Sequence, residues 1–422
     1  MKTNKIYKLT VFLLVMSIVL FNYGNKDVFS IGPLMIHEWV ILALFTIYTL
    51  LYFNYLKITW VDKLFLLFLL FIIIIPVISN MFNIIDGEGN IIGFILPIKI
   101  WLVYRIIYSA LIRYNTDSKI QEIFVYVLNI IIVFSIISAL IGIIRVLQIP
   151  FISDSINLLW PIKRYGIDPI EWGRLVSTVS GTNGSGIYFV ACMFISIYLY
   201  NNNKNIIYII TTIIFFMSII LTGSFSAIGT LLILIPILIY KLKKNLISYK
   251  KIFSMISLVL LLSYAVTSLE NLHIFTKNVI EARVERQLQK SRSPYPFIPS
   301  TLYTRASRWS TQLSILKEKP LFGYGSAIPE EQILRHVSTA QPHNYYVYIL
   351  MNAGIVGFAV YVLFLFLIIK KISNNKKFKN EKILIGMIFS AMIISQIALL
   401  TFQYGGYSEL IGILLAFIYR FK

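Results

Sequence analysis

Charged residues are scarce in this chain: they make up 13% of its 422 residues, whereas a soluble domain carries about 25%. So few charges cannot cover the surface of a soluble protein of this length. Hydrophobic residues make up 58%, and apolar runs long enough to cross a bilayer recur along the whole chain. The composition therefore excludes a soluble enzyme, a fibrous protein and a disordered protein. The runs are continuous rather than alternating, which excludes a membrane barrel.

Cysteine and histidine are scarce as well. Cys192 is the single cysteine, so no intramolecular disulfide can form and a cysteine-based metal site is not expected. The histidines are His37, His273, His336 and His343, and none of them forms an H-x-x-x-H or H-E-x-x-H pattern. The sequence therefore predicts no bound metal.

Acidic residues are outnumbered, with 18 Asp and Glu against 38 Lys and Arg, for a formal charge of +20. In a membrane protein much of such an excess anchors cytoplasmic loops, so we expect no nucleic-acid partner. Lysines gather in short connections such as 241–251 and 370–382, which alternate with poorly basic ones such as 80–90. This pattern predicts that both termini lie in the cytoplasm.

Twelve membrane-spanning helices are predicted. The first is an uncleaved N-terminal segment that ends near Phe21, because no small-residue cleavage site follows it. The others lie at about 34–56, 62–82, 91–112, 122–147, 177–200, 206–222, 226–240, 252–268, 343–369, 383–402 and 405–420. The predicted fold class is an all-α polytopic membrane protein that forms a single membrane domain over residues 1–422.

Two predicted external loops stand out by length, at 148–176 and 269–342. A connection as long as the second is usually functional. Within it the sequence predicts helices over 276–291 and 303–318, separated by the proline-rich run 293–299.

Arginine rather than lysine dominates the cations of these external loops. Arg174 lies in the first loop, and Arg305, Arg308 and Arg335 lie in the second. Arg305 and Arg308 are three residues apart and share a helix face, next to Trp309. The guanidinium fork suits phosphate oxygens, which favours an anionic substrate such as a lipid-linked phosphate. The alternative is that these arginines pair with nearby glutamates or with lipid headgroups.

His343 lies where the long external loop meets the next apolar run, in PHNYYVYILMNAGIVG from residue 342. Pro342 can start a helix, which would place His343 in its first turn near the membrane surface. A neutral imidazole there can accept a proton from a hydroxyl group. The alternative is an ordinary hydrogen-bonded interfacial histidine.

Two further segments combine small and hydroxyl residues. GRLVSTVSGTNGSG at 173–186 allows close helix packing, or Asn183 and its neighbours line a sugar or phosphate site. LTGSFSA at 221–227 predicts a tight external turn, which presents Ser224 and Ser226 outward or is simply a turn.

Taken in order, these segments resemble the O-antigen polymerase/ligase family of bacterial envelope glycosyltransferases. The most specific part, over about 300–360, is the arginine–tryptophan helix, followed by PLFGYG, then HN, then NAGIVG. GRLVSTVSGTNGSG is similar to the family's span-opening motif, and LTGSFSA to its threonine-glycine-serine turn. Phe225 departs from the pattern, because many relatives have arginine at this position.

The resemblance implies a fold similar to the class C glycosyltransferases. It also implies transfer of a glycan from undecaprenyl diphosphate at the outer face of the bacterial cytoplasmic membrane, without a cofactor, nucleotide sugar or metal. His343 matches the family's functional histidine, Arg305 or Arg308 the arginine ahead of the tryptophan, and Arg174 the arginine before the small-residue span. The catalytic set predicted on this basis is His343, Arg305 and Arg174. The predicted substrate-binding set is Arg308, Asn344, Asn183, Tyr345 and Arg335.

The favoured function is a polymerase that joins lipid-linked repeat units of O-antigen or capsular polysaccharide, because the polymerases of this family vary greatly in sequence. The alternatives are a ligase that transfers the glycan to lipid A-core, a flippase of lipid-linked oligosaccharide, and a non-catalytic partner of a synthase. A transporter more often has ionisable residues at mid-membrane, and here only Lys99, Arg105 and Arg145 approach that depth. A flippase and chain-length regulator proteins are expected partners.

Overall fold

The computed structural model describes residues 2–22, 29–31, 34–52, 57–70, 92–112, 114, 116–147, 151–160, 174–242, 300–323, 344–374, 378–397 and 406–421. These segments are mainly helical, and a short antiparallel sheet pairs β1 (Ser30–Ile31) with β2 (Leu34–Met35). The helices are α1 (Lys2–Phe21), α3 (Ile36–Tyr52), α4 (Trp60–Leu69), α6 (Ile92–Leu111), α7 (Asp117–Val146), α8 (Ile152–Leu159), α9 (Thr182–Asn203), α10 (Ile207–Thr222), α11 (Phe225–Leu242), α14 (Ser300–Leu316), α16 (Tyr345–Asn374), α17 (Lys379–Ser395) and α18 (Tyr407–Arg420).

Three of the described helices, α7, α9 and α16, are long and apolar enough to cross a membrane. Shorter apolar helices cover 6–21, 36–52, 207–222 and 225–238. The chain is therefore a helical membrane protein, as predicted. The number of twelve spans stays a prediction, and the predicted span 252–268 lies outside the described residues. The segments predicted as external loops contain α8 and α14.

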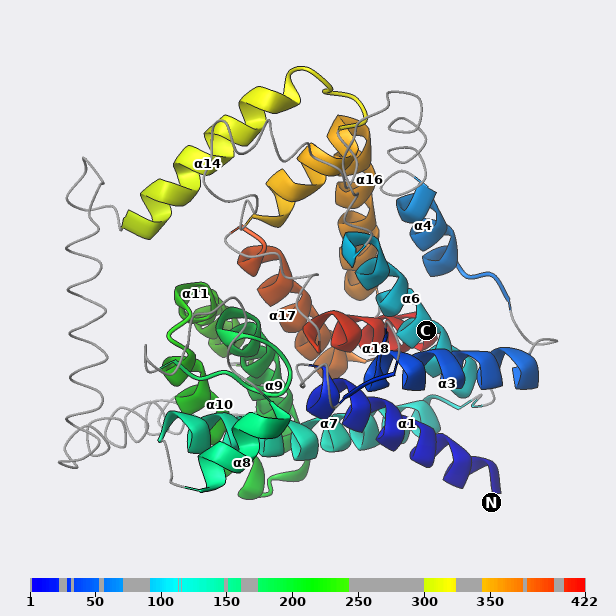
Figure 1. The fold of residues 1–422 in the computed structure, drawn as a ribbon. Coiled ribbons are helices and arrows are strands. Elements are labelled where there is room, and N and C mark those ends of the chain that lie inside the picture. Colours follow the sequence, from blue (N-terminus) through cyan, green and yellow to red (C-terminus); the bar gives the residue numbers. More distant parts are fainter. Residues whose placement is uncertain are drawn as a thin grey trace.

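Helix α9 lies at the centre of a bundle with α7, α10, α11 and α17 (Figure 1). It is buried on nearly every side from Gly184 to Leu199, as expected of a helix that is apolar all round. Gly186 permits the closest approach, because a Cβ atom at this position would lie 2.9 Å from the Cβ of Ala227. The predicted span 177–200 thus begins as a helix only at Thr182, and residues 174–181 form an irregular segment before it.

Lys99 joins a buried polar cluster where α1, α3, α6 and α18 meet. Its Nζ lies 3.3 Å from Glu409 Oε1, 3.4 Å from Glu38 Oε1 and 3.3 Å from His37 Nε2. Glu409 is fully buried and also caps α18, because its Oε2 accepts the amide of Gly406 at 2.6 Å. The sequence flagged Lys99 for its depth, and the structure surrounds it with protein partners.

The other two deep cations are also held by protein groups. Arg105 Nη1 lies 2.9 Å from Asp62 Oδ2, in an ion pair at the start of α4. Arg145 is fully buried at the end of α7, and its Nη1 donates to the carbonyl of Val176 at 3.3 Å. Arg145 thereby ties α7 to the irregular segment that precedes α9.

Helix α16 is broken at Gly354, where φ is 64° and ψ is −166°. The sequence predicts one continuous span over 343–369 that starts at Pro342. The structure instead begins the helix at Tyr345 and bends it into two halves that meet below one end of α14 (Figure 1). The first half, Tyr345 to Ala353, is about 13 Å long at 1.5 Å per residue, which is too short to cross a bilayer.

Candidate functional site

The loop after α14 docks into the break of α16. The amide of Ile355 donates to the carbonyl of Pro320 at 2.9 Å, and the amide of Val356 donates to that of Leu321 at 3.2 Å. Gly323, at φ +67°, lies so close that a Cβ atom there would be 2.5 Å from the carbonyl oxygen of Met351. The PLFG part of the first motif and the NAGIVG motif therefore meet through their backbones and fix the position of α14.

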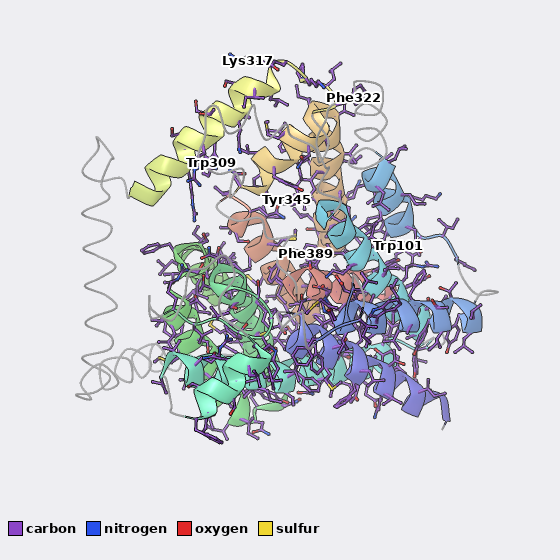
Figure 2. The ribbon with its side chains drawn as sticks, in the orientation of Figure 1. Trp101, Trp309, Lys317, Phe322, Tyr345 and Phe389 are labelled. Carbon is purple, nitrogen blue, oxygen red and sulfur yellow. The ribbon has the colours of Figure 1, made fainter. Side chains whose placement is uncertain are left out.

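An apolar cluster completes this docking. Ile315 and Leu316 of α14 are buried against Val347 and Met351 of the first half of α16, and Trp309 packs against the same cluster. In Figure 2, Phe322 lies near the point where the two halves of α16 meet, whereas Tyr345 lies deeper in the bundle. One face of α14 is thereby fastened to the broken helix.

Helix α14 also carries polar side chains that are partly or fully buried. Arg305 and Arg308 are half-buried, and Arg308 makes no hydrogen bond or ion pair within the described part of the chain. Gln312 is fully buried, and neither its Oε1 nor its Nε2 has a hydrogen-bond partner among the residues that the structure describes. A buried amide without partners costs about 1–3 kcal/mol for each unpaired group, so a ligand that offers oxygen atoms and hydroxyls would be favoured here.

Gln312 is a candidate site residue that the sequence predictions missed. The sequence feature that could have pointed to it is its spacing, because Gln312 follows Arg308 by four residues and Arg305 by seven, on the same helix face. An amide among serines and threonines in an amphipathic helix does not suggest a site by itself. Only the burial of the side chain and its lack of partners distinguish it.

A second cluster joins Arg174 to the turn between α10 and α11. Arg174 Nε donates to the carbonyl of Thr222 at 2.8 Å, and its Nη2 donates to Asn183 Oδ1 at 3.0 Å. The amide of Leu175 donates to the carbonyl of Leu221 at 2.9 Å. The arginine and the asparagine that the sequence singled out are thus brought together at the threonine-glycine-serine turn.

The small residues around Arg174 pack as the simpler reading of their motif predicts. Ser177 and Ser185 are buried, and their hydroxyl oxygens lie 2.8 Å apart. A Cβ atom on Gly186 would lie 3.0 Å from both Thr222 Oγ1 and the Cβ of Ser224. Ser224 is itself buried, so the reading that presents its hydroxyl outward does not hold for Ser224, and the other reading, a simple turn, is left: the turn folds Ser224 back toward α9.

Phe225 is 62% exposed at the start of α11, next to this turn. This exposed position therefore offers space for a longer polar side chain without loss of core packing.

Asn344 and Tyr345 shape the start of α16. Asn344 Oδ1 accepts the amides of Tyr346 at 2.9 Å and Val347 at 3.1 Å, which is the geometry of a helix N-cap. The ring of Tyr345 is buried, stacks on Tyr348 and meets Tyr361 edge to face. Tyr345 thus holds the first half of α16 in the core. His343 and Arg335 lie outside the described residues.

The described residues include no group of three or more His, Cys, Asp or Glu side chains that could hold a metal ion. The two arginine-bearing clusters instead offer cationic and amide donors, which suit phosphate and sugar oxygens.

The apolar helices define an integral membrane protein with an arginine-bearing helix docked on a broken helix. Residues 210–362 of the chain match the family model of O-antigen ligase. The match includes the Thr222 turn, α14, the PLFG loop and the first half of α16, whereas Arg174 and Asn183 precede it. It confirms the resemblance to the O-antigen polymerase/ligase family, whose members are glycosyltransferase-like polymerases and ligases of polysaccharides. No curated protein matches the chain.

Proposed function

We propose that this protein joins lipid-linked repeat units of a surface polysaccharide at the outer face of the cytoplasmic membrane, using a polyprenyl diphosphate-linked glycan as donor. The observation that carries the proposal is the face of α14 with Arg308 and Gln312. It holds an arginine without a described partner beside a buried amide without partners, inside the segment that matches the family. Phosphate and sugar oxygens are the groups that would satisfy both side chains.

In the proposed reaction the acceptor sugar hydroxyl attacks the anomeric carbon of the donor. A new glycosidic C–O bond forms, the bond between this carbon and the diphosphate oxygen breaks, and its electron pair leaves with polyprenyl diphosphate. His343 accepts the hydroxyl proton. Arg174 and the α14 arginines stabilise the charge that grows on the diphosphate, and one such donor can contribute about 3 kcal/mol.

Ligase activity is the second candidate, because the family model that matches the chain is described as O-antigen ligase. Polymerase and ligase would share the donor site and differ only in the acceptor, which is another repeat unit or a lipid-anchored core.

Turnover of a synthetic polyprenyl diphosphate-linked repeat unit by the full chain in proteoliposomes tests the proposal. We expect a ladder of longer glycans from the wild type and strongly reduced turnover from Arg308→Ala and Gln312→Ala. Lys317→Ala is the matched control, since Lys317 is exposed in the turn after α14. Full turnover by both site variants would remove α14 from the site.

Deletion of the gene in its native host separates the candidates. Single repeat units on the surface would support the polymerase, and long chains retained on the lipid carrier would support the ligase. Repeat units trapped on the cytoplasmic face would indicate a flippase and contradict glycosyl transfer.

A further inference from the structure

A pocket lies between α9, α11 and α17, far from the candidate glycan site. Its enclosed part holds only about 30 Å³, and it opens into a shallow groove that brings the empty volume to about 380 Å³. It is lined by residues near the end of α9, such as Asn201, whereas Asn183 and its partner Arg174 lie at the start of α9. Eighteen residues of helix separate Asn183 from Asn201, which is about 27 Å at 1.5 Å per residue. The pocket and the candidate site therefore occupy opposite ends of the same helix.

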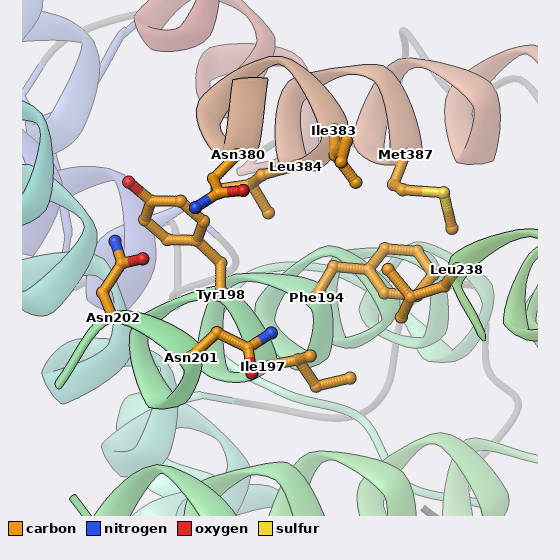
Figure 3. A pocket seen from close by; sticks show the side chains of 10 residues that line it. All are labelled: Phe194, Ile197, Tyr198, Asn201, Asn202, Leu238, Asn380, Ile383, Leu384 and Met387. Carbon is orange, nitrogen blue, oxygen red and sulfur yellow. The ribbon is translucent and has the colours of Figure 1, made fainter. Parts of the chain in front are cut away.

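The lining of the pocket is amphipathic along its length (Figure 3). One end is polar and holds Tyr198, Asn201, Asn202 and Asn380, which lie at the adjoining ends of α9 and α17. The other end extends along the helices and is apolar, with Phe194, Ile197, Leu238, Ile383, Leu384 and Met387. A molecule with a polar head and a hydrocarbon chain matches this division.

The polar end contains an acceptor that no described protein group uses. Asn201 is 8% exposed, and its Oδ1 has no hydrogen-bond partner in the described segments of the chain. Its neighbour Tyr198 is already engaged, since its hydroxyl donates to Glu381 Oε1 at 2.8 Å. Gln121 Nε2 donates to the same oxygen at 2.6 Å. A buried amide oxygen favours a ligand that brings a hydroxyl donor of its own.

The helix ends beside the pocket are cationic. Lys204 ends α9, and Lys379 and Lys382 lie in the first turn of α17, where they outnumber the buried Glu381. The N-terminus of α17 adds the positive end of the helix dipole, and its N-cap residue Phe378 makes no side-chain cap. The lysine-rich segments on this side are those predicted to face the cytoplasm. Basic pockets between membrane helices on that side suit anionic lipid headgroups.

We propose that this pocket binds an anionic glycerophospholipid of the cytoplasmic leaflet whose headgroup carries free hydroxyls. One acyl chain lies along Phe194, Leu238 and Met387. A headgroup hydroxyl donates to Asn201 Oδ1, and the phosphate lies at the N-terminus of α17 beside Lys379. The bound lipid joins α9 to α11 and α17, and this role does not depend on glycan transfer at the other end of α9.

Native mass spectrometry of the full chain tests the proposal. The protein is released from detergent in the presence of increasing concentrations of phosphatidylglycerol or of phosphatidylcholine with the same acyl chains. We expect preferential retention of phosphatidylglycerol. Leu238→Trp fills the apolar end and Asn201→Leu removes the acceptor, and each should weaken this retention about tenfold, equivalent to about 1.4 kcal/mol. Asn203→Leu is the matched control, because Asn203 is exposed at the same end of α9 and does not line the pocket.

Lys379→Glu keeps the test decisive if a pocket variant fails to fold, because Lys379 is exposed and its reversal should weaken phosphatidylglycerol alone. Equal retention of the two lipids would overturn the proposal, as would unchanged retention in Leu238→Trp and Lys379→Glu. Displacement of the lipid by free glycerol phosphate at equal concentration would also overturn it, since the site would then be one for a soluble anion.

Discussion

Gly354→Ala should separate α14 from the broken helix. A Cβ atom at this position would lie 2.3 Å from the carbonyl oxygen of Leu321, and the backbone there is at φ +64°, which a side chain rarely tolerates. The strain costs about 1–3 kcal/mol. Relief of the clash also breaks the hydrogen bonds from Ile355 and Val356 to the PLFG loop, each worth about 1 kcal/mol. We expect the free energy of unfolding to fall by about 3–5 kcal/mol if both effects act together.

The matched control is Gly229→Ala in α11, because no atom lies within 4 Å of the Cβ that it would add. Replacement of a helical glycine by alanine stabilises a helix by up to about 1 kcal/mol, so this variant should unfold no earlier than the wild type. Thermal unfolding of the purified proteins in one detergent, followed by tryptophan fluorescence, gives the comparison. Equal midpoints and equal glycan turnover for the two variants would refute the role of the glycine contact.

Four further substitutions test other parts of the structure. Arg174→Lys keeps the charge but cannot span both acceptors of the guanidinium, so turnover in proteoliposomes should fall, and unchanged turnover would argue against a positioned arginine. Glu409→Gln leaves buried Lys99 with a weaker set of partners. We expect the free energy of unfolding to fall by up to about 3 kcal/mol, which lowers the thermal midpoint. An unchanged midpoint would show that the ion pair adds nothing to stability. Phe225→Arg, at an exposed position, should leave the midpoint unchanged and lower KM for the lipid-linked donor, whereas a raised KM would contradict a phosphate contact there. His343→Ala should abolish turnover in a folded protein, and full activity would remove the proposed base.

The apolar runs predicted where most helices lie, because a membrane helix needs a continuous apolar stretch that is visible in the sequence. They did not predict where α9 begins. Residues 174–181 continue the apolar and small-residue pattern, yet this segment is irregular because Leu175 and Arg174 hydrogen-bond to the end of α10. Such a boundary depends on a contact between segments distant in sequence.

The break in α16 could not be predicted for the same reason. A glycine within a long apolar run is compatible with a continuous helix, and the run from 343 to 369 indicated one. The left-handed conformation at Gly354 is held by the PLFG loop, which follows a different helix. The two motifs were found from the sequence, but the contact between them was not predicted.

The candidate site was predicted in part. The residue types and their positions in the motifs identified Arg174, Asn183, Arg305 and Arg308. The structure brings Arg174 and Asn183 into contact. Gln312 was missed because only its burial without partners distinguishes it from a surface amide.

The most direct test of glycosyl transfer is to measure two products of the purified full chain in proteoliposomes that contain polyprenyl diphosphate-linked repeat units. New glycosidic bonds and released polyprenyl diphosphate would be quantified together. The proposed mechanism predicts that they rise in equal amounts. Intact donor lipid after its transfer across the membrane, with no new glycosidic bonds, would contradict it.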